Sequence, residues 1–361
     1  MTLAVVFLVI GIMGKKICDF VGENIRIRRA FQFAEGLSPG INLGNSLDAY
    51  GLRTYQRNAL PEEFETYWHN PSIQKEWFQG VKAAGFSSVR IPVSWGEHMD
   101  HDNQVDENWM DRVQEVVDMA LKTGLFVILD THHEEWLVTD ETREKQVTEQ
   151  LCALWSQIGE RFADYGDRLL FEGMNEPRLI GSELEWSEGT PKMRAMVNRL
   201  NEAFVETVRS SGGYNEDRYL LLAGYSGSSK PEAFLDVKVP PGDKLMVSIH
   251  DYTPYEFTSE EDGTDVFDQG DVQFQEGMKE KTQLLQKKFI SQGIPVVLTE
   301  FGCKDKDNQK ARLEWTKAYT EIMKDAGIPC FWWDEGSDSR LFDRKTGEPE
   351  QKELIEILCS R

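Results

Sequence analysis

The chain has 361 residues, of which 40% are apolar and 11% aromatic, so it can bury the core of a large globular domain. Its formal net charge of −22 argues against a nucleic-acid or anionic-membrane partner, because both require patches of lysine and arginine. Five widely spaced cysteines with no CxxC pair indicate neither a zinc site nor a disulfide framework, and we expect no disulfide between Cys303 and Cys330.

The chain begins with an apolar run at residues 3–13, which is too short to span a membrane comfortably. The run resembles the apolar region of a secretory signal, but no charged segment precedes it, and Lys15 and Lys16 follow it. We interpret residues 1–25 as an apolar leader or signal-like segment, with a misassigned start as the alternative. Residues 26–361 are left for the folded domain.

From about Gly40 onward, short apolar runs alternate with longer amphipathic stretches. The runs are rich in Val, Ile, Leu and Phe, which is typical of strands buried on both faces of a parallel sheet. They cover residues 41–43, 88–93, 126–129, 169–171, 219–223, 245–249, 295–298 and 330–332. Helical patterns lie between them at residues 73–84, 109–122, 144–165, 193–209, 277–291 and 312–324. Gly85, Gly124, Gly293 and Gly327 follow four of these patterns, at the usual position of a C-terminal cap.

Eight strands that alternate with helices predict a (β/α)8 barrel, also called a TIM barrel, formed by a single domain. A doubly wound open sheet is the alternative, but no GxGxxG motif follows the first strand. No internal repeat, low-complexity tract or Pro/Ser linker indicates a second domain. The irregular stretch at residues 252–271 follows the sixth strand. We expect it to form one wall of a cleft, because the loops after barrel strands build the active face.

Two glutamates each follow a run that predicts a buried strand. Glu176 lies in the sequence MNEP at residues 174–177, and Glu300 lies in LTEFG at residues 298–302. Packing gives no reason for a carboxylate at the end of a buried strand, because desolvating an unpaired charge is costly. Two carboxylates that face each other across a cleft are the arrangement that glycoside hydrolysis requires.

Polar residues also follow most of the other predicted strands. In chain order they are Asn45 and Asp48, Arg90 and Ser94, Asp130, His132, His133 and Glu134, Asn175, His250 and Tyr252, and Trp333, Asp334 and Glu335. Charged and imidazole side chains at so many strand ends are hard to explain by packing alone. They indicate a site at the carboxyl ends of the strands.

Six motifs occur in one order along the chain: GINLGN at 40–45, VRIP at 89–92, HH at 132–133, NEP at 175–177, HxY at 250–252 and TEFG at 299–302. This ordered set resembles the signature series of glycoside hydrolase family 5, and it spans residues 40–336. The longer phrases at 44–49 and 249–255 resemble most closely the endoglucanase and xyloglucanase branch of that family.

The resemblance implies that Glu176 is the general acid/base and Glu300 the nucleophile of a double displacement that retains anomeric configuration. It also implies that Asn175 hydrogen-bonds the 2-hydroxyl group of the sugar at the cleaved bond. The two carboxyl groups of a retaining enzyme lie about 5–5.5 Å apart, and those of an inverting enzyme roughly 6.5–9.5 Å apart. We therefore expect the shorter separation here.

The nucleophile must stay ionised, so it needs cationic or hydrogen-bonding neighbours. Arg90, His250 and Tyr252 are the available candidates. His250 and Tyr252 are two residues apart and can face the same side of an extended segment. A buried ion pair is the structural alternative for Arg90.

His132 and His133 could suggest a metal, but we expect adjacent histidines on an extended segment to point to opposite faces. Sugar contact and pairing with the nucleophile are then the roles we predict for them. Trp333 is the predicted stacking platform under a sugar ring, with Trp332 in the core. Trp136 is a further platform candidate.

Asn45 and Asp48 match a sugar contact on the non-reducing side in related enzymes. A local Asn/Asp turn is the alternative explanation for this pair, because both residue types commonly form turns through their side chains. The two interpretations differ in whether the side chains point to the cleft or to the backbone.

The sequence therefore predicts a retaining endo-β-1,4-glucanase, or cellulase, that hydrolyses internal bonds of a soluble or amorphous β-glucan polysaccharide. Xyloglucan, mixed-linkage glucan or β-mannan is the alternative substrate, because a fold does not choose among them. Two other classes are a sugar-binding protein without turnover and a metal-dependent barrel hydrolase using Asp130, His132, His133 and His250. We expect no cofactor, no metal, no dedicated protein partner and a monomer. We also expect an extracellular, cell-surface or periplasmic location, because a polymer cannot enter the cell.

Overall fold

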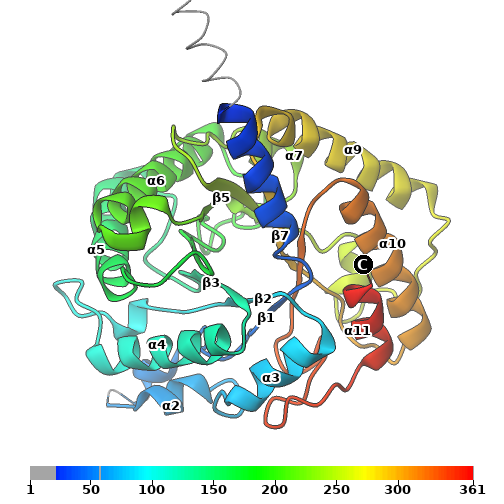
Figure 1. The fold of residues 1–361 in the computed structure, drawn as a ribbon, viewed down its shortest axis with the longest axis horizontal. Coiled ribbons are helices and arrows are strands. Elements are labelled where there is room, and N and C mark those ends of the chain that lie inside the picture. The colour runs from blue at the N-terminus through cyan, green and yellow to red at the C-terminus, as the bar shows by residue number, and fades with distance from the viewer. Residues whose placement is uncertain (1–21, 57, 361) are drawn as a thin grey trace, which may run out of the picture.

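The computed structural model describes residues 22–56 and 58–360. In this part of the chain, eight parallel strands close into a barrel in which every strand pairs with its neighbours in chain order (Figure 1). The strands are β1 Gly40–Asn42, β2 Ser88–Ile91, β3 Phe126–Asp130, β4 Leu169–Glu172, β5 Leu220–Ser228, β6 Leu245–His250, β7 Val296–Phe301 and β8 Cys330–Trp332. The prediction of a single-domain (β/α)8 barrel is confirmed, and the alternative of an open doubly wound sheet is wrong.

Helices surround the barrel and cover its outer face (Figure 1). They are α2 Pro61–Glu65, α3 Lys75–Ala84, α4 Glu107–Lys122, α5 Glu144–Arg161, α6 Pro191–Ser210, α7 Pro231–Leu235, α8 Tyr255–Thr258, α9 Val272–Lys288, α10 Gln309–Asp325 and α11 Lys352–Cys359. All six predicted helical patterns are present, with shifted ends. Helix α9 begins five residues before the predicted start, because the Asp271 side chain caps it by accepting from the Gln273 amide. Gly85 ends α3 in the left-handed conformation, with φ 112°.

The N-terminal end of the barrel is closed by a helix at residues 22–35 (Figure 1). Phe33 stacks on Tyr219 with ring centroids 3.9 Å apart, and Leu37 is fully buried just after the helix. The residues they cover are the inward-facing ones near the strand starts: Ile128, Leu170, Leu221, Met246, Val297 and Phe331. The predicted leader boundary at residue 25 falls inside this helix. The rest of that segment, residues 1–21, lies outside the described residues.

Farther along the strands, the barrel interior changes from apolar to polar. Inward positions recur every second residue, and the second inward layer consists of buried polar side chains. They are Asn42, Arg90, Asp130, Glu172, Ser248 and Thr299. This layer forms the floor of the carboxyl-terminal end of the barrel. Barrel topology thus places polar groups from six different strands within reach of one another.

The long connection after β6 is not wholly irregular, because it contains the short helix α8. Phe257 and Phe267 of this connection are buried and pack together, with ring centroids 5.6 Å apart. Among the described cysteines, Cys152, Cys303, Cys330 and Cys359 are free thiols, as we expected for the pair Cys303 and Cys330. No helix in residues 22–56 and 58–360 is long and apolar enough to cross a membrane.

Candidate active site

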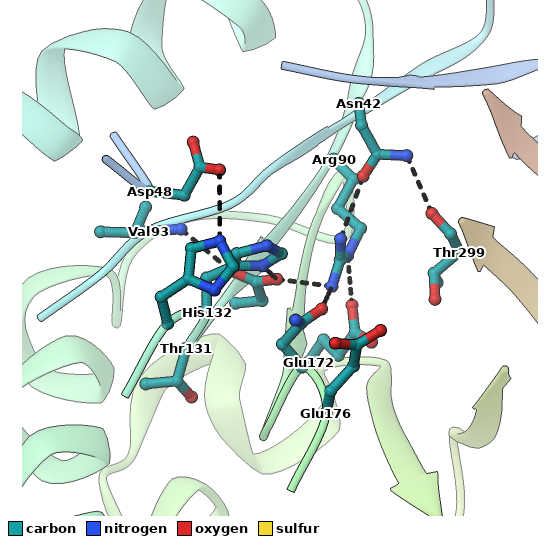
Figure 2. A network of polar contacts seen from close by, with 12 residues as sticks. Asn42, Asp48, Arg90, Val93, Thr131, His132, Glu172, Glu176 and Thr299 are labelled. Atoms are coloured by element: carbon teal, nitrogen blue, oxygen red, sulfur yellow. Dashed lines mark hydrogen bonds and ion pairs between the residues drawn. The ribbon is translucent and has the colours of Figure 1, made fainter. Parts of the chain in front are cut away.

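Arg90 on β2 is the centre of the polar layer, and its side chain is fully buried (Figure 2). Each of its three nitrogens contacts at least one oxygen. Nε donates to Glu172 Oε2 at 2.6 Å, and Nη1 donates to Glu300 Oε1 at 2.7 Å and to Asn42 Oδ1 at 3.0 Å. Nη2 donates to Asn175 Oδ1 at 2.6 Å and forms an ion pair with Asp130 Oδ2, also at 2.6 Å. The buried ion pair weighed for Arg90 is therefore present. Its role at the active site stays a prediction.

Glu300 lies near the end of β7 with its side chain almost fully buried. Besides Arg90, its carboxylate accepts from the Tyr252 hydroxyl at 3.1 Å, and His250 Nδ1 lies 3.4 Å from Oε2. Burial raises the pKa of Glu300 to about 6, because the charged form loses hydration, while His250 and Arg90 oppose that rise. The three neighbours predicted for this carboxylate are the ones that contact it.

An irregularity in β7 turns Glu300 into the barrel. Val297 and Thr299 face inward, so strict alternation would send Glu300 outward. The β6–β7 register instead shifts between Ile249 and His250, and His250 pairs with Glu300. Phe301 accordingly points outward and stacks on Tyr319 of α10. Bulges of this kind re-aim side chains next to active sites.

Glu176 follows β4, and its side chain lies close to Arg90 and Glu172 in the site (Figure 2). Its Oε1 lies 2.9 Å from His250 Nδ1, and its Oε2 lies 3.7 Å from Arg178 Nη1. Burial raises the pKa of Glu176 to about 7, an effect that the positive charges of Arg178 and Arg90 reduce. A carboxyl group with this pKa can both give and take a proton near neutral pH.

His250 Nδ1 lies between the two glutamates, and one oxygen of each, together with a ring nitrogen, falls within 4.8 Å of the others. Burial lowers the pKa of His250, so the ring is neutral and has one proton to donate. Placed on Nδ1, that proton can bond one carboxylate at a time. The two glutamates are thus close enough to act on one sugar carbon and its leaving oxygen.

His132 and His133 lie side by side, with ring centroids 4.4 Å apart. The expectation that they point to opposite faces is wrong, because β3 ends at Asp130 and the alternation of the strand ends there. His132 Nδ1 lies 2.9 Å from Asp130 Oδ2, and His133 Nε2 lies 3.9 Å from Asp48 Oδ2. Burial lowers the pKa of both rings well below the usual range, so both are neutral.

Two groups of side chains could approach a metal ion inside the site: Asp48 with His132 and His133, and Glu176 with His250 and Glu300. Within the described ranges, His250 thus belongs to a different group from the histidine pair. The metal-dependent alternative requires Asp130, His132, His133 and His250 around one ion, and these four side chains do not form such a group. In the structure, His132 Nδ1 already bonds Asp130, and His250 Nδ1 already bonds Glu176.

Asp48 is buried and bonds its own turn. Its Oδ2 accepts from the Asn45 amide at 3.0 Å and its Oδ1 from the Ser46 amide at 2.7 Å. Asn45 adopts the left-handed conformation with φ 55°, which Asn tolerates better than most residues. These contacts favour the turn interpretation of Asp48. The sugar contacts of Asn45 and Asp48 remain predictions.

Of the two tryptophans at the end of β8, Trp332 lies in the core as predicted, and Trp333 is more exposed. Trp332 is fully buried and donates from Nε1 to the Ser339 carbonyl at 2.8 Å. Trp333 is half-buried and lies parallel to His132, with centroids 5.8 Å apart and an interplanar angle of 7°. Trp136 is also half-buried, and its indole donates to Glu134. The stacking roles of Trp333 and Trp136 remain predictions.

Sequence reasoning missed Glu172, which bonds Arg90 and also accepts from the Ser248 hydroxyl at 2.6 Å. The signal was present, because Glu172 directly follows the predicted strand at 169–171. It also missed Tyr50 and Trp68, whose rings lie 5.2 and 5.5 Å from that of His133. Both come from the β1 loop, where no periodic pattern indicates their position.

The closed parallel barrel places half-buried Glu176 after β4 close to buried Glu300 on β7, which is the two-carboxylate arrangement of glycoside hydrolases. The family model described as "Cellulase (glycosyl hydrolase family 5)" matches residues 50–339. The chain belongs to glycoside hydrolase family 5. It is 41% identical to endoglucanase A of Ruminococcus albus over 89% of this chain and 90% of the relative.

Other relatives agree with this family. Endoglucanase A of Clostridium longisporum is 39% identical over 85% of this chain, which spans 60% of the length of that relative. A solved broad-specificity endoglucanase from Ruminococcus champanellensis with bound cellotriose superposes with TM-score 0.87 at 36% identity, covering 91% of this chain and 98% of that one. A solved xyloglucan-specific endo-β-1,4-glucanase from a metagenomic library superposes with TM-score 0.86 at 35% identity, covering 92% of this chain and 99% of that one.

Proposed function

We propose that this family 5 member is an endo-β-1,4-glucanase that retains anomeric configuration, with Glu300 as nucleophile and Glu176 as acid/base. The observation that carries the proposal is the close approach of the half-buried Glu176 carboxylate and the buried Glu300 carboxylate in unlike surroundings. Glu300 receives hydrogen bonds from a guanidinium and a phenol, which favour its ionised form. Glu176 has the higher pKa, about 7, which favours its protonated form.

In the first step, Glu300 attacks the anomeric carbon and Glu176 protonates the departing glycosidic oxygen. The product is a glycosyl ester on Glu300 and a shortened glucan chain. Asn175 is held by Arg90 at 2.6 Å, so its amide nitrogen is free to donate to the 2-hydroxyl group of the sugar. This contact strengthens as positive charge develops on the ring.

In the second step, Glu176 removes a proton from water, which attacks the same anomeric carbon and releases Glu300. Formation of the ester removes the negative charge of Glu300, and this lowers the pKa of Glu176. Glu176 therefore becomes a carboxylate when the reaction needs a base. Two inversions at one carbon restore the original configuration.

The substrate is a soluble or amorphous β-1,4-glucan cut at internal bonds, as the names of the endoglucanase relatives suggest. The similarity to a xyloglucan-specific enzyme favours xyloglucan as a second substrate. The two carboxylates and water suffice for the chemistry, so the enzyme works without a cofactor. It acts as a monomer outside the cytoplasm, where a polymer is accessible.

Proton NMR of the first products from a cello-oligosaccharide tests the stereochemistry. The β-anomer should form first and mutarotate later, and initial release of the α-anomer would refute a retaining mechanism. Glu300→Gln and Glu176→Gln should each lower kcat by orders of magnitude and leave the fold intact.

Initial rates on carboxymethylcellulose, barley glucan, xyloglucan and mannan test the substrate. Viscosity should fall faster than reducing ends appear, because internal cuts shorten chains quickly. Mannan as clearly the best substrate would overturn the glucanase assignment.

A further inference from the structure

One guanidinium serves three carboxylates at the floor of the site. Arg90 bonds Asp130, Glu172 and Glu300 at 2.6 to 2.7 Å, and the first two are fully buried (Figure 2). Only Glu300 has a role in the reaction proposed above. The two other carboxylates place more negative than positive charge in the barrel interior, although desolvated charge is costly. We therefore expect the two additional buried carboxylates to have a function.

Glu172 has contacts with protein groups on both oxygens. Oε2 accepts from Arg90 Nε and Oε1 accepts from the Ser248 hydroxyl, each at 2.6 Å. Ser248 Oγ in turn lies 2.5 Å from Thr299 Oγ1, one residue before Glu300. Glu172 is fully buried on the barrel axis side of β4, below the two glutamates of the site. It therefore cannot touch a sugar, but it fixes the Nε edge of Arg90.

We propose that Glu172 is a positioning residue that orients Arg90 and takes part of its charge, so that Glu300 keeps the basicity of an effective nucleophile. This inference rests on the role of Glu300 proposed above. It assigns a purpose to a carboxylate that the reaction itself does not use.

The physical reason is the balance between ionisation and reactivity. A carboxylate paired alone with an arginine forms a strong charge-assisted hydrogen bond, which lowers both its pKa and its readiness to attack. Reactivity of a base or nucleophile falls as its pKa falls. Burial raises the pKa of Glu300 to about 6 in spite of the bond from Arg90 Nη1, and Arg90 divides its charge among three carboxylates.

Other titratable groups around Glu300 come from the neighbouring elements and are unchanged in the variant Glu172→Gln. They are Asp130 on β3, Glu176 after β4, His250 on β6 and Tyr252 after β6. Glu172 differs from them, because it neither faces the cleft nor contacts Glu300. Its charge can be removed without touching the reacting groups.

Glu172→Gln removes the charge and keeps the contacts. The Gln oxygen can accept from Arg90 Nε, and the Gln amide can donate to Ser248 Oγ. Ser248 can then donate to Thr299, since either hydroxyl of that pair can be the donor. The variant should therefore fold, which circular dichroism and a melting curve would verify.

The assay is the pH dependence of kcat/KM for a dinitrophenyl β-cellobioside. Its leaving group needs no proton, so activity on the acid side of the profile depends on ionisation of Glu300 and not on Glu176. The acid limb of the profile is the range in which kcat/KM falls as Glu300 becomes protonated. We expect this limb to lie about one pH unit lower in Glu172→Gln than in wild type, which is a tenfold change in the ionisation constant of Glu300. Loss of activity with an unmoved acid limb, or an upward shift, would overturn the proposal.

Glu65→Gln is the matched control, since Glu65 is a fully buried carboxylate paired with Arg112 away from the site. It should lower stability and leave the acid limb in place. If Glu172→Gln does not fold, Asp130→Asn tests the same sharing of Arg90 from β3 and should shift the limb in the same direction. Full activity of Glu300→Gln would instead refute the proposed function, so the two failures are distinguishable.

Discussion

Tyr252→Phe isolates a single hydrogen bond to the proposed nucleophile. The Tyr252 hydroxyl donates to Glu300 Oε2 at 3.1 Å, and the Phe ring would keep the packing. Burial and the nearby glutamates raise the pKa of Tyr252 well above its ordinary value, so the hydroxyl stays protonated throughout the working range. Its hydrogen bond is stronger to the carboxylate than to the neutral carboxyl group, so it favours the ionised form of Glu300.

The expected size of the effect follows from the geometry. A hydrogen bond to a charged group contributes about 1.5–3 kcal/mol to stability. A distance of 3.1 Å is longer than that of a strong charge-assisted O–H···O⁻ bond, so the lower end of this range applies. About 1.5 kcal/mol corresponds to about one pKa unit. Without Tyr252, the pKa of Glu300 should rise from about 6 by roughly that amount.

The acid limb of kcat/KM with the dinitrophenyl substrate should therefore move to higher pH, opposite to the shift expected for Glu172→Gln. Tyr255→Phe is the control, because Tyr255 is 61% exposed and lies only three residues further along the same loop. It should leave the profile unchanged. An acid limb that stays in place or moves down in Tyr252→Phe would refute the assignment of Glu300 as the ionised group.

Three other predictions concern stability and metal dependence. The pKa of Glu176 is raised from 4.5 to about 7, so its contribution to stability is present below pH 4.5 and is lost as pH rises through 7. Above pH 7, Glu176→Gln should therefore raise the free energy of unfolding by about 3 kcal/mol relative to wild type, and below pH 4.5 it should give no gain. Urea titrations at both pH values would measure the difference. Leu37→Ala should cost about 2–5 kcal/mol by leaving a cavity at the closed end of the barrel, with an unchanged pH profile. A chelator should leave kcat unchanged, and a loss restored by a divalent cation would favour the metal-dependent alternative.

The strands could be predicted because each is buried on both faces, which imposes an unbroken apolar run of the right length. The site could be located because polar residues interrupt those runs at one end only. The roles within it required the family motifs, since spacing alone does not separate an acid from a nucleophile. Glu172 could have been found by the rule that identified Glu176 and Glu300.

Other features depend on tertiary contacts that no local pattern contains. The helix at residues 22–35 is held by Phe33 against Tyr219 and by Leu37 against the strand starts, which are far away in the sequence. The side-by-side arrangement of His132 and His133 follows from the end of β3 at Asp130, and strand ends are the least certain part of a sequence-based assignment.

The bulge in β7 links the barrel to the chemistry. Thr299 bonds Ser248 through its inward-facing hydroxyl, and its carbonyl accepts from the Asn42 side-chain amide, so the strand is fixed up to the residue before Glu300. The extra residue then lets Glu300 face inward as well, although regular alternation would place it among the helices. Two consecutive polar residues can thus both face the barrel interior, where Thr299 holds the strand and Glu300 is the proposed nucleophile. Because of this irregularity, a strict two-residue alternation along β7 would place Glu300 on the outer face of the barrel. The TEFG motif therefore located Glu300 better than the alternation did.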